Sequence, residues 1–238
     1  MMKRLTLILS CVLSMVLLTS CDDGDIYDKE VVYNVSGRTA KLTGHLAGLS
    51  HWPTSHYIAL AGFVKDNDYA VISKIVPSTS EDVDLVLSNI PDSVESVELC
   101  VLSRLRKRIY TLASKSGDAI ATNDTIILES DGDVSMFNII QQHTFNTTCV
   151  NCHGGSNFAG AGLYLTEGKS YSAMVGQPST KLPDFQIVES GDAANSVLHK
   201  VLRTDITKSW RYDHTSEIVS YDVLNLIDSW ISNGAYEN

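Results

Sequence analysis

The sequence predicts a two-domain β + α protein, in which a β domain is followed by a small helical domain. Between residues 31 and 128, short runs rich in Val, Ile, Leu and Tyr alternate with clusters of turn residues. After about residue 134, apolar residues recur at helical spacing instead. With 238 residues, of which 44% are hydrophobic, the chain is long enough for two small cores.

The N-terminus predicts a lipoprotein signal peptide over residues 1–20. Lys3 and Arg4 precede an apolar run over residues 5–18, which is too short for a membrane span. The run ends in Leu-Thr-Ser-Cys, which resembles the bacterial lipobox, so we expect Cys21 to be lipidated. An ordinary secretory signal followed by an accidental cysteine is the alternative.

Residues 21–30 form an acidic tether that begins Cys-Asp-Asp-Gly-Asp. An acidic cluster directly after a lipidated cysteine resembles the surface-export signal of Bacteroidetes lipoproteins, although a solvated tether would have the same composition. We therefore expect an outer-membrane lipoprotein, attached to the membrane through its N-terminal lipid and facing the periplasm or the cell surface. Loss of Lys3 and Arg4 changes the formal charge from −10 to −12, which argues against nucleic acid as a partner.

Residues 31–128 are predicted to form an immunoglobulin-like β-sandwich, because six or seven short strands fit into about a hundred residues. The expected strands cover residues 38–46, 57–64, 69–76, 83–90, 94–102, 109–113 and 125–128. The sequence spacing of His45, His51 and His56 fits neither a helix face nor a strand face, so we interpret them as surface or satisfied histidines. A basic run over residues 104–108 indicates a solvated turn, with a docking patch for an acidic partner as the alternative.

The most informative motif is Cys149-Val150-Asn151-Cys152-His153. In a C-x-x-C-H site, two thiols add to the vinyl groups of a haem and the histidine binds its iron. Cys100 remains outside this pair and is expected to be a small buried hydrophobe. A redox disulfide or a zinc site could use the same cysteines, but no thioredoxin-like pattern and no second ligand pair accompany them.

Residues 129–238 are predicted to contain several helices. The first carries Met136, Ile139, Ile140 and His143, has Asp133 as its N-cap, and leads into the motif. A short helix is expected at residues 169–175, stopped by Gly176, and another after Asp192 as N-cap. The final helix begins after Ser220 and ends at Asn233-Gly234.

Four sequence blocks in this region resemble a family of bacterial mono-haem cytochrome c domains. In order they are C-x-x-C-H, Gly162-Leu163-Tyr164-Leu165, Gly191-Asp192-Ala193-Ala194-Asn195-Ser196-Val197-Leu198 and Trp230-Ile231-Ser232-Asn233-Gly234-Ala235. The resemblance implies a small all-α cytochrome c domain over residues 129–238 that holds one haem c. It also implies that Trp230 and Leu163 pack near the haem, with Trp230 where the first and last helices meet.

The second axial ligand departs from the family pattern. The family usually places a Met-Pro pair before its last helix, whereas this chain has His214 close to that position. His214 is therefore the predicted distal ligand, with Met174 and His199 as alternatives, and two imidazoles would give a lower potential than a thioether.

These observations predict an electron carrier rather than an enzyme. We expect one-electron transfer at the cell envelope with a redox partner protein. A peroxidase would need an open sixth position on the iron. The alternative is a cell-surface binding or interaction module whose haem is structural or sensory.

Overall fold

The structure is a computed structural model that describes residues 37–116, 125–155, 157–204, 206 and 212–238. The predicted signal peptide, Cys21 and the acidic tether lie outside the described residues. Residues Val35–Asn238 form one compact unit. In the described part of the chain, no helix is long and apolar enough to cross a membrane.

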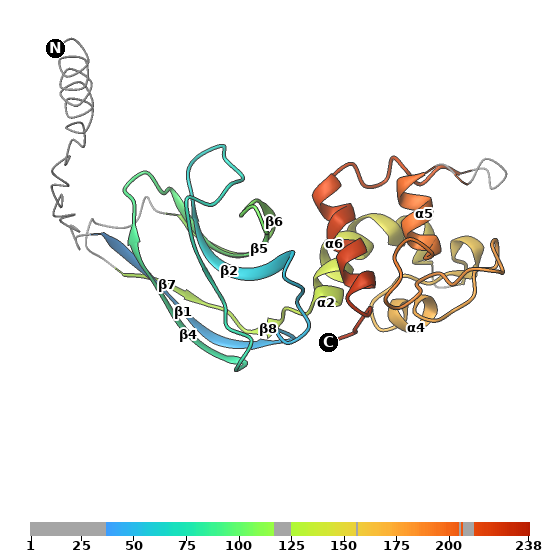
Figure 1. The fold of residues 1–238 in the computed structure, drawn as a ribbon, viewed down its shortest axis with the longest axis horizontal. Coiled ribbons are helices and arrows are strands. Elements are labelled where there is room, and N and C mark those ends of the chain that lie inside the picture. The colour runs from blue at the N-terminus through green and yellow to red at the C-terminus, as the bar shows by residue number, and fades with distance from the viewer. Residues whose placement is uncertain (1–36, 117–124, 156, 205, 207–211) are drawn as a thin grey trace, which may run out of the picture. The chain divides into compact units, whose positions relative to one another are not determined.

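Two β-sheets make up most of the regular structure (Figure 1). One has the strand order β4-β1-β7, with β8 also paired to β1, and the other has the order β3-β2-β5-β6. β1 is antiparallel to β4 and parallel to β7. The strands are β1 (Arg38–Ala47), β2 (His56–Phe63), β3 (Ile72–Ile75), β4 (Asp82–Ile90), β5 (Ser96–Ser103), β6 (Arg108–Ser116), β7 (Thr125–Glu129) and β8 (Gly132–Asp133).

The sequence pattern of each strand explains its place in the sheets. Along β4, Val83, Leu85 and Leu87 are buried while the residues between them are exposed, as expected for a strand with one face on a core. β2 and β5 are buried along almost their whole length, because they are the two central strands of their sheet. The predicted strand at residues 69–76 is shorter than expected: only Ile72–Ile75 pair with β2.

The chain after β8 forms short helices joined by turns and irregular segments. They are α2 (Met136–Ile140), the π-helix η2 (Gln141–Cys149), α3 (Val150–His153), the 3-10 turn η3 (Gly160–Gly162), α4 (Ser170–Met174), α5 (Val197–Arg203) and α6 (Tyr221–Ser232). Ser220 caps α6 as predicted, and its hydroxyl accepts the Val223 N–H. The predicted cap of α2 was wrong: Ser135, not Asp133, accepts the Asn138 N–H.

The predicted fold class, a β-sandwich followed by a small all-α cytochrome c domain, is wrong. Strands hold more of the described residues than helices do, and the helices after residue 134 are short, with only α6 reaching 12 residues. The physical reason is packing. Buried side chains of the sheets, such as Leu42 and Leu99, belong to the same hydrophobic cluster as Phe137 and Trp230, so the C-terminal segment has no separate all-α core.

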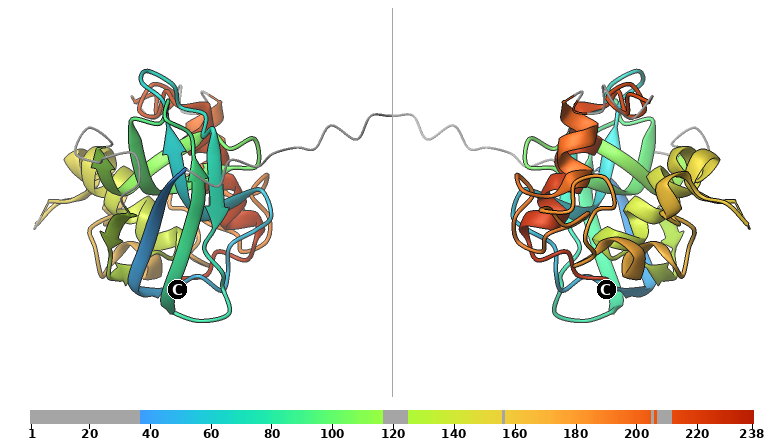
Figure 2. Two further views of the ribbon diagram at one scale, coloured as in Figure 1. Left: turned by 90° about the vertical axis from the view of Figure 1, so that its left-hand side faces the viewer. Right: turned by 90° about the vertical axis from the view of Figure 1, so that its right-hand side faces the viewer.

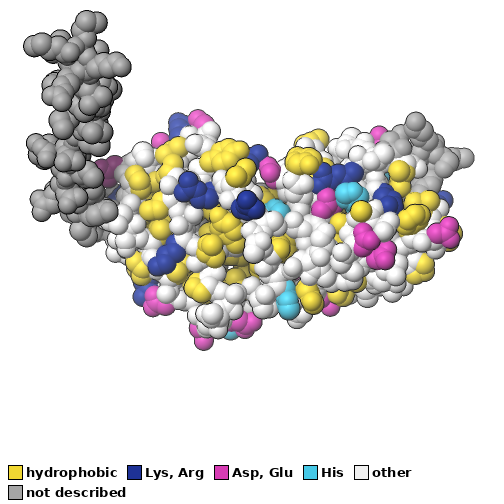
Figure 3. Space-filling view, viewed as in Figure 1, with side chains coloured by type: hydrophobic (Ala, Val, Ile, Leu, Met, Phe, Trp, Pro, Cys, Tyr) yellow, Lys and Arg dark blue, Asp and Glu magenta, His cyan; other side chains and the backbone are white. Residues whose placement is uncertain are grey.

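Polar contacts also join the sheets to the C-terminal segment. Trp52 Nε1 donates to the Val134 carbonyl at 3.0 Å, and the Tyr110 hydroxyl lies 2.8 Å from Thr144 Oγ1. Figure 2 shows the strands and the short helices from two further sides. On the face in Figure 3, acidic, basic and apolar side chains are interspersed.

Candidate functional site

Cys149, Cys152 and His153 lie where the π-helix η2 passes into α3. Cys149 is the last residue of η2, and Cys152 and His153 belong to the single turn of α3. Both cysteines are free thiols; Cys149 is half-buried and Cys152 is exposed. The turn therefore presents two unpaired thiols and an imidazole within five residues.

Gln141 fixes the start of the π-helix to the loop that follows the motif. Its side chain is buried, and its amide nitrogen donates to Asn146 Oδ1 at 2.7 Å and to the Leu165 carbonyl at 3.0 Å. Its amide oxygen accepts a hydrogen bond from the Ser170 hydroxyl. π-Helical turns are rare and frequently occur at functional sites. This network fixes the π-helix, which ends at Cys149, relative to the loop.

His153 is held by the same loop on two sides. The Leu165 N–H donates to the His153 carbonyl at 2.8 Å, and His153 Nδ1 lies 3.1 Å from the Leu163 carbonyl oxygen. Because a carbonyl only accepts, Nδ1 carries the hydrogen and Nε2 keeps its lone pair. Metal-binding histidines are commonly oriented in this way, through a hydrogen bond from the other ring nitrogen. A Cβ on Gly160 would lie 3.1 Å from His153 Cε1, so the glycine allows the backbone to pass close to the ring.

His214 approaches His153 from the segment before α6. The Tyr212 ring packs edge-on against it with centroids 5.0 Å apart, and the Tyr212 hydroxyl donates to the Glu217 carboxylate. His214 Nδ1 is buried and has no hydrogen-bond partner. Burial, and then the proximity of the His153 ring, lowers the pKa of His214, which favours the neutral imidazole that binds metals.

The two histidine rings have a separation that suits a metal ion between them. Their centroids are 6.3 Å apart and their planes differ by 31°. An imidazole nitrogen binds a metal at about 2 Å, which puts the ring centres of two opposing ligands roughly 6 Å apart. Among the described residues, no group of three or more His, Cys, Asp or Glu is arranged to hold a metal ion. A haem needs only two axial ligands from the chain, because the porphyrin supplies the other four.

The protonation of Cys149 bears on the competing interpretation of the motif as a redox disulfide. Burial raises the pKa of the Cys149 thiol to about 11. Redox dithiols instead have a cysteine whose pKa is lowered by nearby positive charge or a helix N-terminus. The environment of Cys149 therefore favours a protonated thiol over a reactive thiolate.

The two alternative distal ligands have other surroundings. Met174 is completely buried at the end of α4, within the shared hydrophobic cluster. His199 Nδ1 lies 2.7 Å from Asp228 Oδ1, and Arg203 donates to the other oxygen of this carboxylate at 2.6 Å. Of the three candidates, His214 is the one that lies beside His153.

The two residues predicted to pack on a haem lie in different environments. Leu163 contributes its carbonyl to His153, as described above, and its side chain is partly buried. Trp230 is 2% exposed, packs against Phe137 at 5.2 Å, and donates its Nε1–H to the Tyr236 carbonyl at 2.8 Å. Trp230 thus lies where α2 meets α6.

Sequence reasoning missed the residues that support the two histidines. Gln141 and Ser170 gave no signal, because their contact joins positions 29 residues apart. Tyr212 lies two residues before His214, so the sequence could have indicated it as a neighbour of the ring. Comparison of the chain with protein-family models, with curated proteins and with solved structures gave no match.

Proposed function

We propose that the chain carries one covalently bound haem c at Cys149, Cys152 and His153 and transfers single electrons at the cell envelope. The observation that carries the proposal is the histidine pair: two imidazoles with centroids 6.3 Å apart, one beside a C-x-x-C pair of free thiols. The unpartnered, buried Nδ1 of His214 and the oriented ring of His153 add to it.

Covalent attachment uses the two cysteines. Each thiol S–H adds across one vinyl double bond: the sulfur forms a bond to one carbon, and the proton goes to the other. No group leaves and no oxidant is required. Two intervening residues on a single helical turn suit two thiols that must reach neighbouring vinyl groups, and both thiols are unpaired.

His153 and His214 are the residues that would hold the haem iron. The haem, when bound, supplies an iron that gains and loses one electron. His153 offers Nε2, because its Nδ1–H is engaged by the Leu163 carbonyl. His214 is the proposed distal ligand, and two imidazoles favour a lower potential than an imidazole and a thioether. If both histidines bound the iron, no position would remain open for peroxide.

Lipidation of Cys21 would keep this haem at the outer membrane. The acidic tether of residues 21–30 would separate it from the lipid surface, and a redox partner protein would exchange electrons with it. Haem attachment in an oxidising compartment agrees with the export signal in the sequence.

The attachment proposal is tested by co-expression with a haem-maturation system, followed by haem staining after denaturing electrophoresis. We expect stain to migrate with the wild-type chain and to be lost when Cys149 and Cys152 are both replaced by Ala. Cys100→Ala is the matched control, because Cys100 is a buried cysteine on β5. It should keep the stain. A wild-type chain without covalent haem, or a stained double variant, would show the proposal to be wrong.

The distal ligand is tested by absorption and electron paramagnetic resonance spectra of the oxidised protein. His214→Ala should convert a low-spin iron to a high-spin iron, whereas His199→Ala, which removes the Asp228 partner, should leave it low-spin. A near-infrared methionine–iron band in the wild type would instead identify Met174 as the ligand.

A further inference from the structure

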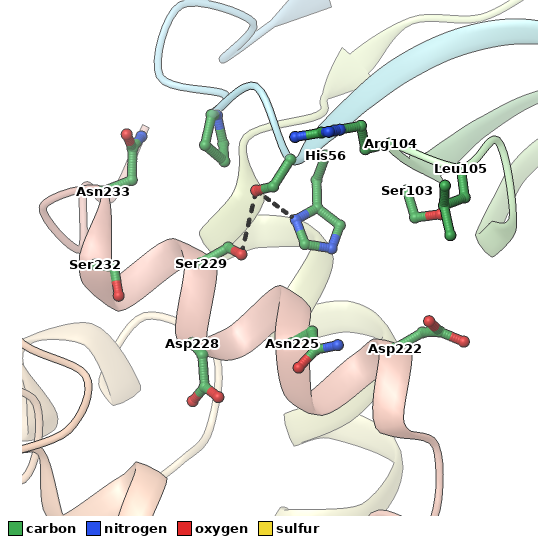
Figure 4. Close-up of a pocket in the computed structure, with 12 residues that line it drawn as sticks. His56, Ser103, Arg104, Leu105, Asp222, Asn225, Asp228, Ser229, Ser232 and Asn233 are labelled. Atoms are coloured by element: carbon green, nitrogen blue, oxygen red, sulfur yellow. Dashed lines mark hydrogen bonds between the residues drawn. The ribbon is translucent and has the colours of Figure 1, made fainter.

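A cleft of about 550 Å³, lined mostly by residues of polar type, lies between the sheets and α6 (Figure 4). Its volume falls within the range of small-molecule sites, which is roughly 300–1,000 Å³. One wall comes from the start of β2 and the turn after β5, and the other is the exposed side of α6. None of its lining residues is used by the proposed haem site, so the inference below does not rest on that proposal.

His56 presents an unpartnered nitrogen to this cleft. The residue is 5% exposed, and its ring is directed toward α6 in Figure 4. The Ser55 hydroxyl donates its hydrogen to Ser229 Oγ at 3.3 Å. Ser55 Oγ also lies 3.0 Å from His56 Nδ1. Because the only hydroxyl hydrogen of Ser55 is already used, Nδ1 of the imidazole is the donor in this second bond. Nε2 then keeps its lone pair. Among the described residues, none forms a hydrogen bond with it.

Burial lowers the pKa of His56, which favours this neutral form. A neutral Nε2 accepts a hydrogen bond and donates none, so the group that completes this site is a donor such as a hydroxyl.

The acidic residues of the cleft already have partners. Lys107 Nζ donates to Asp222 Oδ2 at 2.7 Å. Asp228 accepts from Arg203 at 2.6 Å and lies 2.7 Å from His199. The remaining charged side chain in the lining is Arg104, whose guanidinium has no partner in the described part of the chain. In Figure 4 it lies on the same side of the cleft as His56, across from α6. The charge in the cleft that has no partner is therefore the positive charge of Arg104.

Most of the other lining groups are small, neutral and able to both donate and accept. They are Ser55, Ser103, Ser229, Ser232, Asn225 and Asn233. Leu105, which is 76% exposed, and Pro53 add apolar side chains to the lining. Rows of hydroxyl and amide groups match the spaced hydroxyls of a sugar ring, and its C–H groups suit these apolar side chains. The apolar side chains in the lining are those of Pro53 and Leu105, which are too few to form the separate apolar pockets that the side chains of a peptide would require.

We propose that the cleft binds a carbohydrate that bears a carboxylate. The Arg104 guanidinium would pair with the carboxylate, for which its planar, bidentate geometry is suited. His56 Nε2 would accept from one sugar hydroxyl, while Ser232 and Asn225 on α6 would bond others. A charge-assisted hydrogen bond to Arg104 would give the acidic sugar a higher affinity than a neutral sugar of the same size.

The test is calorimetric titration of the purified whole chain with a galacturonic acid trimer and with a galactose trimer. We expect the acidic trimer to bind about tenfold more tightly than the neutral trimer at low ionic strength. Arg104→Gln should remove this difference and leave the weaker, neutral binding unchanged. Arg106→Gln, in the same basic turn but outside the lining, is the matched control and should change neither affinity.

Ser232→Ala gives a second measurement that leaves the fold intact, because Ser232 is exposed on α6. It should weaken both trimers equally, since it removes a hydroxyl contact and no charge. The proposal is overturned if neither trimer binds, or if both bind equally well. It is also overturned if Arg106→Gln weakens binding as much as Arg104→Gln, or if an acidic peptide displaces the bound trimer.

Discussion

The sheets and the C-terminal segment that begins at α2 satisfy their buried polar groups in different ways. In the second sheet, the buried carboxylate of Glu98 accepts from Arg108 at 2.7 Å, from Thr111 at 2.7 Å and from Ser96 at 2.8 Å. In the C-terminal segment, His214 keeps a buried Nδ1 without any partner. Unpaired buried polar groups are costly, so each one in a folded protein requires an explanation.

Two arginine side chains, one in each region, also have an unpaired buried nitrogen, but they differ from His214 in their other hydrogen bonds. Arg38 and Arg203 also have an unpaired buried Nε, yet each donates twice through Nη2. The ring of His214 has no such compensation among the described residues, and it lies beside His153. The buried Glu98 carboxylate of the second sheet thus finds its partners on the strands of that sheet, whereas His214 lacks a partner that the proposed haem would provide.

The largest expected effect follows from this difference and is measured by hydrogen–deuterium exchange. Haem-loaded wild-type chain should exchange at least about a hundredfold more slowly at residues 141–155 and 212–218 than the Cys149→Ala, Cys152→Ala variant. The strands of the sheets should exchange at similar rates in both. Equal protection everywhere would mean that the two regions do not differ in what stabilises them.

The next prediction tests whether the two regions share one core. Trp230→Ala should lower the free energy of unfolding by about 3–5 kcal/mol, because it empties a fully buried site against Phe137 and loses the bond to Tyr236. Leu42→Ala on β1 should lower it by about 2–5 kcal/mol. Urea unfolding followed by circular dichroism should show one transition that both variants shift. Two separate transitions, each shifted by one variant, would contradict the shared cluster.

The sequence predicted individual elements better than their assembly. The alternation in β4 and the Ser220 cap of α6 are local signals, and both predictions are confirmed. The all-α domain was wrong because four short motifs specify local segments but neither helix lengths nor the packing against the sheets. The π-helix could not be foreseen, since Ile139, Ile140 and His143 fit an α-helical period equally well.

The two candidate sites, the histidine pair and the cleft at His56, differ in whether the sequence predicted them. His153 and His214 were predicted to act together, and they lie together. The cleft at His56 was not foreseen, because its hydrogen bond between Ser55 and Ser229 joins residues 174 positions apart. Long-range contacts of this kind leave no local pattern in one sequence.

Acid should destabilise the protein, because some of its histidines are buried in their neutral form. Burial lowers the pKa of His56 and of His143, so the unfolded chain binds more protons as the pH falls below about 6.5. This contribution is complete above that pH and is lost as the pH falls through the lower, folded pKa. His45 acts in the opposite direction, since its bond to Asp82 raises its pKa.

The measurement is the loss of unfolding free energy between pH 7.5 and pH 5, determined for the wild type and for each variant. His56→Gln should make the loss of stability smaller than in the wild type. His45→Gln should make the loss of stability larger than in the wild type, because the bond to Asp82 raises the pKa of His45. If both variants follow the wild-type slope, His56 does not carry the acid sensitivity.

The smallest expected effect concerns the loop that orients His153. A Cβ at Gly160 would approach His153 Cε1 to 3.1 Å and Nδ1 to 3.4 Å, which is tight enough to displace the ring by a few tenths of an ångström. Gly160→Ala should therefore cost about 1 kcal/mol of stability and shift the absorption bands of the bound haem, while the thioether bonds stay intact. Ala161→Gly is the neighbouring control: Ala161 has φ of 54°, so glycine relieves strain and should stabilise the fold by up to about 1 kcal/mol without moving the bands. Equal spectra for both variants would mean that the loop does not set the orientation of the proximal imidazole.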